Sequence, residues 1–170
     1  MTMQNLLARI ACGVGALLLA AGPAAAANIV IVNLDPPGVG LNDPTPVAPV
    51  GGNPGTTLGQ QRAFVYQLAA QLWGGTIEST VPISVGATFQ PLSCSATSGT
   101  LGAAGTTYIF ANFPNAPFTS TWYHSALADA LAGADLVPGD IDIISFFNSS
   151  IDAGNPNCLG ARGWYYGFDH

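Results

Sequence analysis

The chain has 170 residues, with three lysine and arginine residues together against nine acidic ones and a formal net charge of -6. Charged residues make up 7% of it, compared with about 25% in typical soluble domains, while the hydrophobic content of 49% is too high for an intrinsically disordered chain. The acidic excess repels phosphate backbones and anionic headgroups, which argues against nucleic-acid binding and electrostatic membrane binding.

The first 27 residues have the pattern of a secretion signal. Arg9 precedes an apolar stretch, 10–21, which is far shorter than the roughly 20 residues of a membrane-spanning helix. A run of small residues then ends at Ala27, and we expect cleavage between Ala27 and Asn28, with Ala25 and Ala27 as the small pair. Acylation of Cys12 is the alternative, but Arg9 stands where such a site needs an apolar residue.

Cleavage leaves 143 residues, 28–170, which is an ordinary length for a single domain. This mature chain holds two arginines, no lysine and nine acidic residues, so its formal charge is -7. We expect it to be secreted, in the extracellular space or the periplasm, with no membrane segment after signal cleavage.

The mature chain begins with a predicted strand and a long loop. Residues 28–34 (NIVIVNL) are β-branched and apolar at nearly every position, which predicts a strand buried on both faces. Residues 35–56 hold six of the thirteen prolines and many glycines, so they form neither a helix nor an internal strand. A loop of this length is functional, flexible or pinned by its neighbours, and we favour a pinned, extended path across the surface.

A capping box predicts the first helix. Thr57 and Gln60 have the spacing in which the hydroxyl accepts from a first-turn amide and the glutamine reaches back to the cap. The predicted apolar stripe is Phe64, Leu68 and Leu72, and Gly74-Gly75 ends the helix.

The second half adds three strands and one helix. Strands are predicted at 81–89, 106–113 and 141–147, and a helix from 121 to 132 is capped by Thr119 or Ser120 and stopped by Gly133. The resulting β-α-β-β-α-β order predicts an α+β domain in which a mixed, twisted β-sheet is backed by two helices.

Two cysteines remain after signal removal. In an oxidising compartment Cys94 and Cys158 are expected to form a disulfide, which closes a loop worth roughly 4 kcal/mol in the chain-entropy model. Two buried free thiols are the alternative.

No catalytic or metal-binding motif is complete. A Walker A loop and a Ser-x-x-Lys signature both need lysine, and Gly-x-Ser-x-Gly is absent. The zinc motif His-Glu-x-x-His is also absent, since the only histidines are His124 and His170 and the only glutamate is Glu78. A Ser-His-Asp triad cannot be judged from order alone. We therefore assign no catalytic residue, no metal ligand and no cofactor within this chain.

Two side-chain clusters could bind ligands. Trp164, Tyr165 and Tyr166 could form an aromatic surface for a peptide or a polysaccharide, although such clusters more often pack internally. A set of aspartates around the second helix could supply oxygen ligands to calcium, but their spacing does not match an EF-hand loop, and solvated turn carboxylates are the simpler interpretation. This set is Asp129, Asp135, Asp140 and Asp142.

Two segments carry a family resemblance. Residues 41–62 (LNDPTPVAPVGGNPGTTLGQQR) and the element GWYYG at 163–167 resemble the N-terminal region of secreted bacterial metalloprotease-like proteins of the zincin type. These proteins often carry a protease-associated domain. The resemblance extends from Asn28 to the end of the chain, and implies the N-terminal half of a zincin catalytic module.

In that family a helix bearing His-Glu-x-x-His follows the WYYG element and holds zinc. This chain extends three residues beyond Gly167 and has no position that matches a zinc ligand or the catalytic glutamate. The resemblance therefore implies an incomplete module, inactive alone, whose partner is the C-terminal half or a peptide substrate. The alternative is a non-catalytic extracellular module that binds a peptide or polysaccharide.

Overall fold

The computed structural model describes residues 26–152 and 154–169. The expected secretion signal therefore lies outside the described residues, except for Ala26 and Ala27. The elements along the chain are β1 (Ile29–Asn33), the 3-10 helix η1 (Gly40–Asn42), α1 (Leu58–Gly74), β2 (Ile83–Gln90), β3 (Gly102–Thr106), β4 (Ile109–Phe110), β5 (Tyr123–His124), α2 (Ser125–Ala132), β6 (Ile143–Asn148) and the 3-10 helix η2 (Ser149–Ile151).

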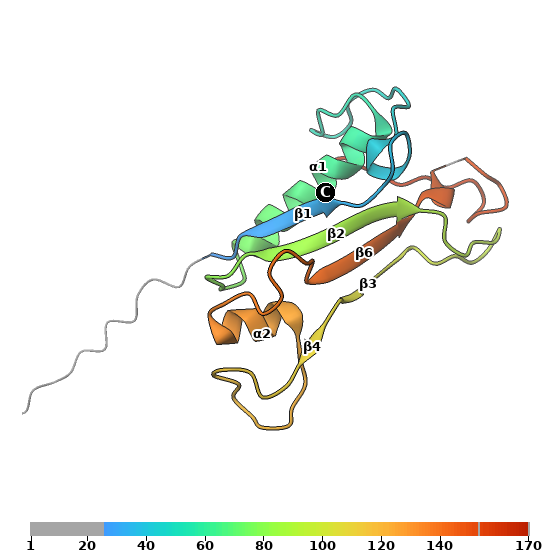
Figure 1. Ribbon diagram of the computed structural model, residues 1–170. Coiled ribbons are helices and arrows are strands. Elements are labelled where there is room, and N and C mark those ends of the chain that lie inside the picture. Colours follow the sequence, from blue (N-terminus) through green and yellow to red (C-terminus); the bar gives the residue numbers. More distant parts are fainter. Residues whose placement is uncertain (1–25, 153, 170) are drawn as a thin grey trace, which may run out of the picture.

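The described residues form an α+β fold around a mixed four-stranded sheet. Its strand order is β1-β2-β6-β3, and β1, β2 and β6 run parallel to one another while β3 is antiparallel to β6 (Figure 1). The prediction of an α+β domain with a mixed sheet and two helices is thereby confirmed.

Strand β1 is not buried on both faces, contrary to the prediction. It is an edge strand, and the side chain of Val30 is 42% exposed. Its neighbour Ile31 packs against the core on the other face, where α1 lies along the sheet. A continuous apolar run therefore formed an edge strand with one covered face.

The side of helix α1 that faces the core is not the apolar stripe predicted from the sequence. Leu72 is 65% exposed, whereas Val65 and Tyr66 pack against the core cluster of the sheet. The first two turns set this rotation, because Gln61 and Arg62 are buried there and hydrogen-bonded to the preceding loop.

The helix ends largely follow the predictions. Thr57 caps α1 by accepting from the amide of Gln60 at 3.2 Å, while the Gln60 side chain bonds the amide of Thr56, one residue before the cap. Gly133 ends α2 with a left-handed φ of 70°, a conformation that glycine adopts without strain.

Helix α2 begins later than predicted and does not back the sheet. Its N-cap is His124 rather than Thr119 or Ser120, because Tyr123 and His124 pair with β4 as strand β5. The helix packs mainly against β4 and β5, beyond the end of the sheet (Figure 1). Of the two α-helices in the described residues, only α1 lies along the sheet.

The predicted strand at 106–113 is divided between two strands. Strand β3 takes Gly102–Thr106 and pairs with β6, while β4 takes only Ile109–Phe110 and pairs with β5. The sequence GAAGT has no β-branched residue before Thr106, so pairing with β6 rather than local preference makes it a strand.

The long loop at 35–56 is pinned, as we favoured. The side-chain amide of Gln61, which is buried, donates to the carbonyl oxygens of Ala48 (2.8 Å) and Gly55 (3.0 Å). The amide of Val47 bonds the carbonyl of Thr56 at 3.0 Å. These bonds fold the loop back onto the start of α1.

The predicted disulfide between Cys94 and Cys158 is present, and it links residues 64 positions apart. It joins the segment between β2 and β3 to the segment after η2. Cys158 is buried, and the amide of Leu159 donates to the carbonyl of Ser95 beside it. This bond anchors the chain that leads to Trp164.

Candidate functional site

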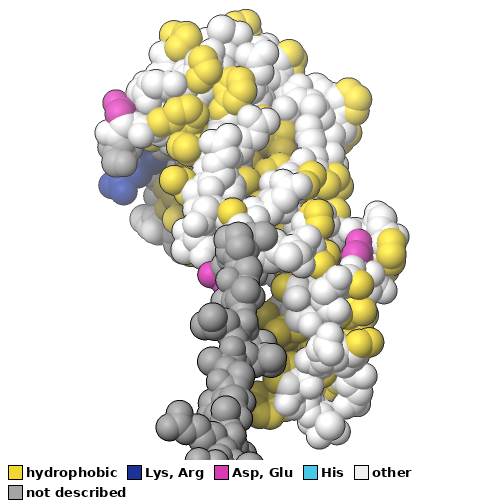
Figure 2. Space-filling model, turned by 90° about the vertical axis from the view of Figure 1, so that its left-hand side faces the viewer, with side chains coloured by type: hydrophobic (Ala, Val, Ile, Leu, Met, Phe, Trp, Pro, Cys, Tyr) yellow, Lys and Arg dark blue, Asp and Glu magenta, His cyan; other side chains and the backbone are white. Residues whose placement is uncertain are grey.

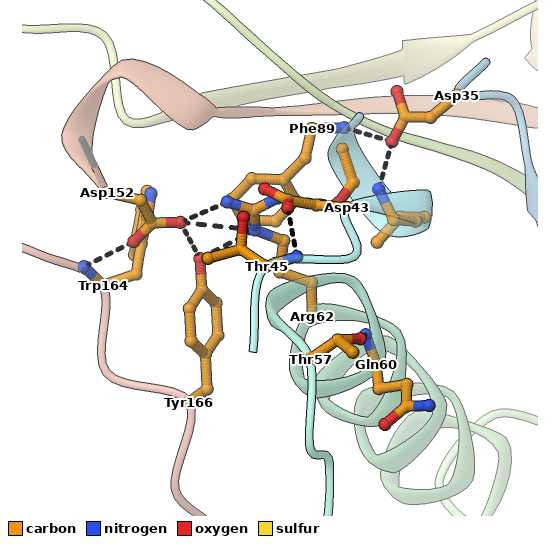
Figure 3. A network of polar contacts seen from close by, with 12 residues as sticks. Asp35, Asp43, Thr45, Thr57, Gln60, Arg62, Phe89, Asp152, Trp164 and Tyr166 are labelled. Atoms are coloured by element: carbon orange, nitrogen blue, oxygen red, sulfur yellow. Dashed lines mark hydrogen bonds and ion pairs between the residues drawn. The ribbon is translucent and has the colours of Figure 1, made fainter. Parts of the chain in front are cut away.

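A buried arginine organises the end of the sheet where the three parallel strands finish. The Arg62 side chain is 3% exposed and comes from the second turn of α1. Its Nη2 donates to Oδ2 of Asp152 at 2.8 Å, and its Nη1 donates to the carbonyl oxygen of Gly40 at 2.6 Å and to Asp43 at 3.4 Å (Figure 3). One guanidinium thus joins α1, η1 and the segment after η2.

Tyr166 completes this network. Its hydroxyl donates to Oδ2 of Asp152 and accepts from Nε of Arg62 at 3.2 Å (Figure 3). Burial raises the pKa of Tyr166, and the negative charge of Asp152 raises it further, so the phenol stays protonated. Arg62 also lies over the ring of Phe89, with its guanidinium carbon 4.8 Å from the ring centre.

The network holds together the two segments that carry the family resemblance. Asn53 is fully buried, and its side-chain amide donates to the carbonyl oxygens of Gln61 (3.0 Å) and Tyr166 (2.8 Å). The amide of Phe168 donates to the carbonyl of Gly51 at 2.6 Å. Residues 41–62 and 163–167 therefore form one packed unit.

An open concavity of about 700 Å³ lies beside this network, at the carboxyl ends of β1, β2 and β6. This is where open sheets with parallel strands commonly bind ligands. However, Asp35 accepts from the amides of Leu41 (2.7 Å) and Phe89 (2.9 Å), and Asp43 accepts from the amide of Thr45. Both carboxylates thus fix the backbone at this end of the sheet, and Asp43 also bonds Arg62.

A second hollow is strongly apolar and lies between α1 and the terminal aromatic segment. It measures about 270 Å³, and we call it the aromatic groove. Phe147 of β6 forms part of it, in edge contact with Trp164 at 5.8 Å between ring centres. The lining is Arg62, Val65, Tyr66, Ala69, Phe89, Phe147, Trp164, Tyr165 and Tyr166.

The three predicted surface aromatics have different environments. Tyr165 is 49% exposed and bonds Asp169, whereas Tyr166 is buried in the arginine network. Trp164 donates from its indole nitrogen to the carbonyl oxygen of Asn148 at 2.8 Å. The three side chains therefore line the aromatic groove and the core rather than one flat exposed face.

The described residues do not fit a zinc site. Residues 26–152 and 154–169 contain no group of three or more histidine, cysteine, aspartate or glutamate side chains arranged to hold a metal. His124 lies exposed at the start of α2, and His170 lies outside the described residues. The zinc implied by the family resemblance would need donors from elsewhere.

The four candidate calcium aspartates are divided among different partners. Asp129 lies beside Asp142, while Asp135 accepts from the amide of Val137 and Asp140 accepts from the hydroxyl of Tyr108. This arrangement fits turn and capping roles.

The Asp129 and Asp142 pair joins α2 to the sheet. Asp129 is 3% exposed and accepts from the amide of Leu136, and Asp142 accepts from the amide of Ser84 at 2.8 Å. Burial raises the pKa of Asp129 to about 6, and the neighbouring Asp142 and Asp135 raise it as well. The pair therefore holds a proton in mildly acidic solution.

We expect Asp129→Asn to abolish the part of the pH dependence of the free energy of unfolding that comes from the raised pKa of Asp129. Because the folded pKa of Asp129 is above its unfolded value of about 3.9, this group stabilises the fold fully below about pH 4 and loses that contribution as pH rises to about 6. An asparagine can still accept from Leu136 and can donate to Asp142. Urea unfolding at pH 7.5 should show a gain on the order of 1–2 kcal/mol.

Asp135→Asn is the matched control, because it removes a nearby charge without replacing the buried carboxyl. It should keep most of the wild-type decline in stability between pH 4 and 7. Identical pH profiles for wild type and Asp129→Asn would contradict the shared proton.

The sequence did not reveal the Arg62 network. The available signal was composition, since Arg62 is one of only two arginines after the expected signal. A rare cation in an acidic chain is expected to have an acidic partner, but the partner Asp152 lies 90 residues away.

Comparisons with protein-family models, curated proteins and solved structures found no match to this chain. No helix in the described ranges is long and apolar enough to cross a membrane.

Proposed function

We propose that this chain is the N-terminal portion of a secreted metalloprotease-like protein, and that it is inactive alone because it lacks the zinc-binding motif. The observation that carries the proposal is the contact between residues 41–62 and 163–167. Arg62 and Tyr166 are 104 residues apart, yet they share a buried network with Asp152. The two segments behind the resemblance therefore belong to one structural unit.

The aromatic groove supplies the docking surface for the remaining half of the module. Phe147 is 36% exposed although it stacks on Phe89 at 5.5 Å, and Tyr165 is half exposed. On the face shown in Figure 2, separate hydrophobic patches lie among uncharged polar atoms, and charged side chains are few. A helix with one apolar side, laid beside α1, would cover such a groove.

In this proposal the helix that covers the groove belongs to the remaining half of the module, and it carries His-Glu-x-x-His and any zinc. Its histidines and glutamate would bind the metal and activate a water molecule. The N-terminal portion contributes the sheet, the aromatic groove and the Arg62 network that fixes the groove's aromatic wall. A binding module that uses the terminal aromatics has less support, because Trp164 and Tyr166 are engaged internally.

The coding sequence after codon 170 tests this proposal. Sequencing the transcript should show an open frame, in this or an adjoining gene, that encodes an amphipathic segment with His-Glu-x-x-His. A stop codon with no such segment nearby, together with a well-behaved secreted product, would favour the binding module instead.

We expect the uncovered groove to cause self-association of the isolated chain. Ala69 is an exposed α1 residue that lines the groove, so Ala69→Glu adds a charge there without removing a packed side chain. Burying that charge is unfavourable, and the self-association constant measured by sedimentation should fall by about tenfold or more.

Gln67→Glu is the control, since Gln67 is also exposed on α1 but faces β1 rather than the groove. It should associate as the wild type does. A wild-type chain that remains a monomer at high concentration would argue against an uncovered docking surface.

A further inference from the structure

We propose that the loop between β4 and β5, residues 111–122, binds a neutral polysaccharide of β-linked pyranose rings, the chemistry that cellulose and chitin share. Two side chains of this loop, Phe118 and Trp122, stack on the sugar rings, and we call them the aromatic pair. The loop belongs to the lobe of β4, β5 and α2, which lies beyond the end of the sheet and away from the aromatic groove (Figure 1). Binding at this lobe needs secretion, but it does not need the remaining half of the module.

The aromatic pair has the highest exposure of any large hydrophobic side chains in the described residues. Phe118 is 68% exposed and Trp122 is 66% exposed. The two residues are four positions apart, so their Cα atoms are separated by about 14 Å at most, and one polymer chain can contact both rings. Because large aromatic side chains gain much from burial, a loop that presents two of them to solvent is typical of a binding surface.

The loop is held in one shape by its own contacts. The buried ring of Phe113 packs edge-on against the ring of Tyr123, with 5.2 Å between the ring centres. The amide of Phe118 donates to the hydroxyl of Tyr123 at 3.2 Å. The amide of Ser120 donates to Oδ1 of Asn112 at 2.8 Å. The aromatic pair is therefore displayed on a fixed frame, and little backbone freedom is lost when a ligand binds.

Three residues of the loop have a backbone conformation that is uncommon outside glycine. The φ angles of Asn112, Asn115 and Ser120 are 56°, 66° and 57°. Elsewhere in the described residues, only Leu159 and Ala161 are non-glycine residues with a positive φ. Such conformations persist where surrounding contacts fix them, and they are concentrated at binding and active sites. Their concentration in this loop supports a binding role for the aromatic pair.

The surroundings of the aromatic pair are polar but uncharged. No aspartate, glutamate, lysine or arginine occurs in residues 79–128, which include the whole loop. The exposed polar neighbours in the loop carry hydroxyl or amide groups, which both donate to and accept from sugar hydroxyls; they include Asn115, Thr119, Ser120 and Thr121. Aromatic rings contact the apolar C–H faces of pyranose rings. This surface therefore complements a neutral polysaccharide in both charge and polarity.

A lipid bilayer is the other surface that exposed aromatic side chains commonly contact. Thr119, Ser120 and Thr121 lie between the two aromatic residues in sequence. Inserting the aromatic pair into hydrocarbon would carry these hydroxyls and their backbone groups away from water, which is strongly unfavourable. Residues 79–128 also lack the basic side chains that attract an anionic bilayer. The loop therefore favours a polysaccharide over a membrane.

Co-sedimentation with insoluble polysaccharide tests the proposal. The exported chain is mixed with cellulose or with chitin, and the protein left in the supernatant gives the dissociation constant, corrected by a tube without polysaccharide for self-association. We expect binding to at least one of the two, and the tighter one identifies the sugar. Because no ion pair is involved, raising sodium chloride to about 0.5 M should change the dissociation constant by less than about twofold. The absence of binding to both polymers would overturn the proposal.

Variants of the aromatic pair locate the binding surface. Phe118→Ser/Trp122→Ser should raise the dissociation constant by about tenfold or more, whereas Trp122→Phe keeps a ring and should lose less. Trp73→Ser is the matched control, because Trp73 is 61% exposed on α1, and it should bind as the wild type does. All variants should keep the wild-type thermal midpoint, since the substituted side chains are exposed.

Two outcomes would contradict this assignment. Equal affinities for the double variant and for Trp73→Ser would show that the polysaccharide binds elsewhere on the chain. Binding to phosphatidylcholine vesicles that the double variant loses, without binding to cellulose or chitin, would assign the aromatic pair to a bilayer instead.

Discussion

Replacing Arg62 with methionine is expected to lower the free energy of unfolding by about 3–5 kcal/mol, a larger loss than we expect from any other single substitution in this chain. Methionine fills a similar volume, but it leaves Asp152 buried without a cation, and it removes the donor to the carbonyl of Gly40. The Arg62 guanidinium also contacts Tyr166, so the aromatic groove should loosen as the network breaks. Urea unfolding monitored by tryptophan fluorescence measures both effects.

Arg162→Met is the matched control for this experiment. It removes the same charge from the other described arginine, which is exposed, and should change stability by less than about 0.5 kcal/mol. The double variant Arg62→Met/Asp152→Asn should recover part of the loss, because it removes the uncompensated carboxylate. Equal stabilities for Arg62→Met and Arg162→Met would rule out the network as a main determinant of the fold.

Removing the disulfide should have the second largest effect. Substitution of both Cys94 and Cys158 with serine opens a loop of 64 residues and should cost roughly 4 kcal/mol in the chain-entropy model. The segment after η2 should loosen first, since the disulfide fixes it to the region between β2 and β3. Unfolding curves of the double variant and of the wild type with a reductant should then coincide.

A thiol count provides the control for the disulfide prediction. The native mature chain should show no free thiol, before or after denaturation, because its two cysteines are paired. Two reactive thiols after denaturation without a reductant, or an unfolding curve unchanged by reductant, would contradict the disulfide.

Local signals explain the parts of the fold that the sequence predicted well. The threonine cap at Thr57 and the glycine stop at Gly133 depend on bonds within a few residues, and both are present. The disulfide was also predictable, because only two cysteines remain after the expected signal.

The errors arose where distant partners override local preference. Strand β3 exists through pairing with β6, although its sequence is mainly glycine and alanine. Helix α1 buries Arg62 rather than Leu72, because partners 19 to 104 residues away bind the arginine. A single sequence shows the periodicity of a helix but does not show which of its polar residues have buried partners elsewhere.

The candidate site was harder to predict than the fold for the same reason. Asp152 and Tyr166 are close to each other in sequence, but both form the network by binding Arg62, which is far from them in sequence. The sequence shows the three aromatic residues as one group, yet only the fold separates the exposed Tyr165 from the buried Tyr166.

Zinc binding by the exported chain alone tests the central claim most directly. After dialysis against a slight excess of zinc and then metal-free buffer, elemental analysis should find less than about 0.1 equivalent per chain, because tight zinc binding needs three or four converging protein donors. One equivalent of zinc held at submicromolar affinity, with proteolysis that a chelator abolishes, would contradict the account.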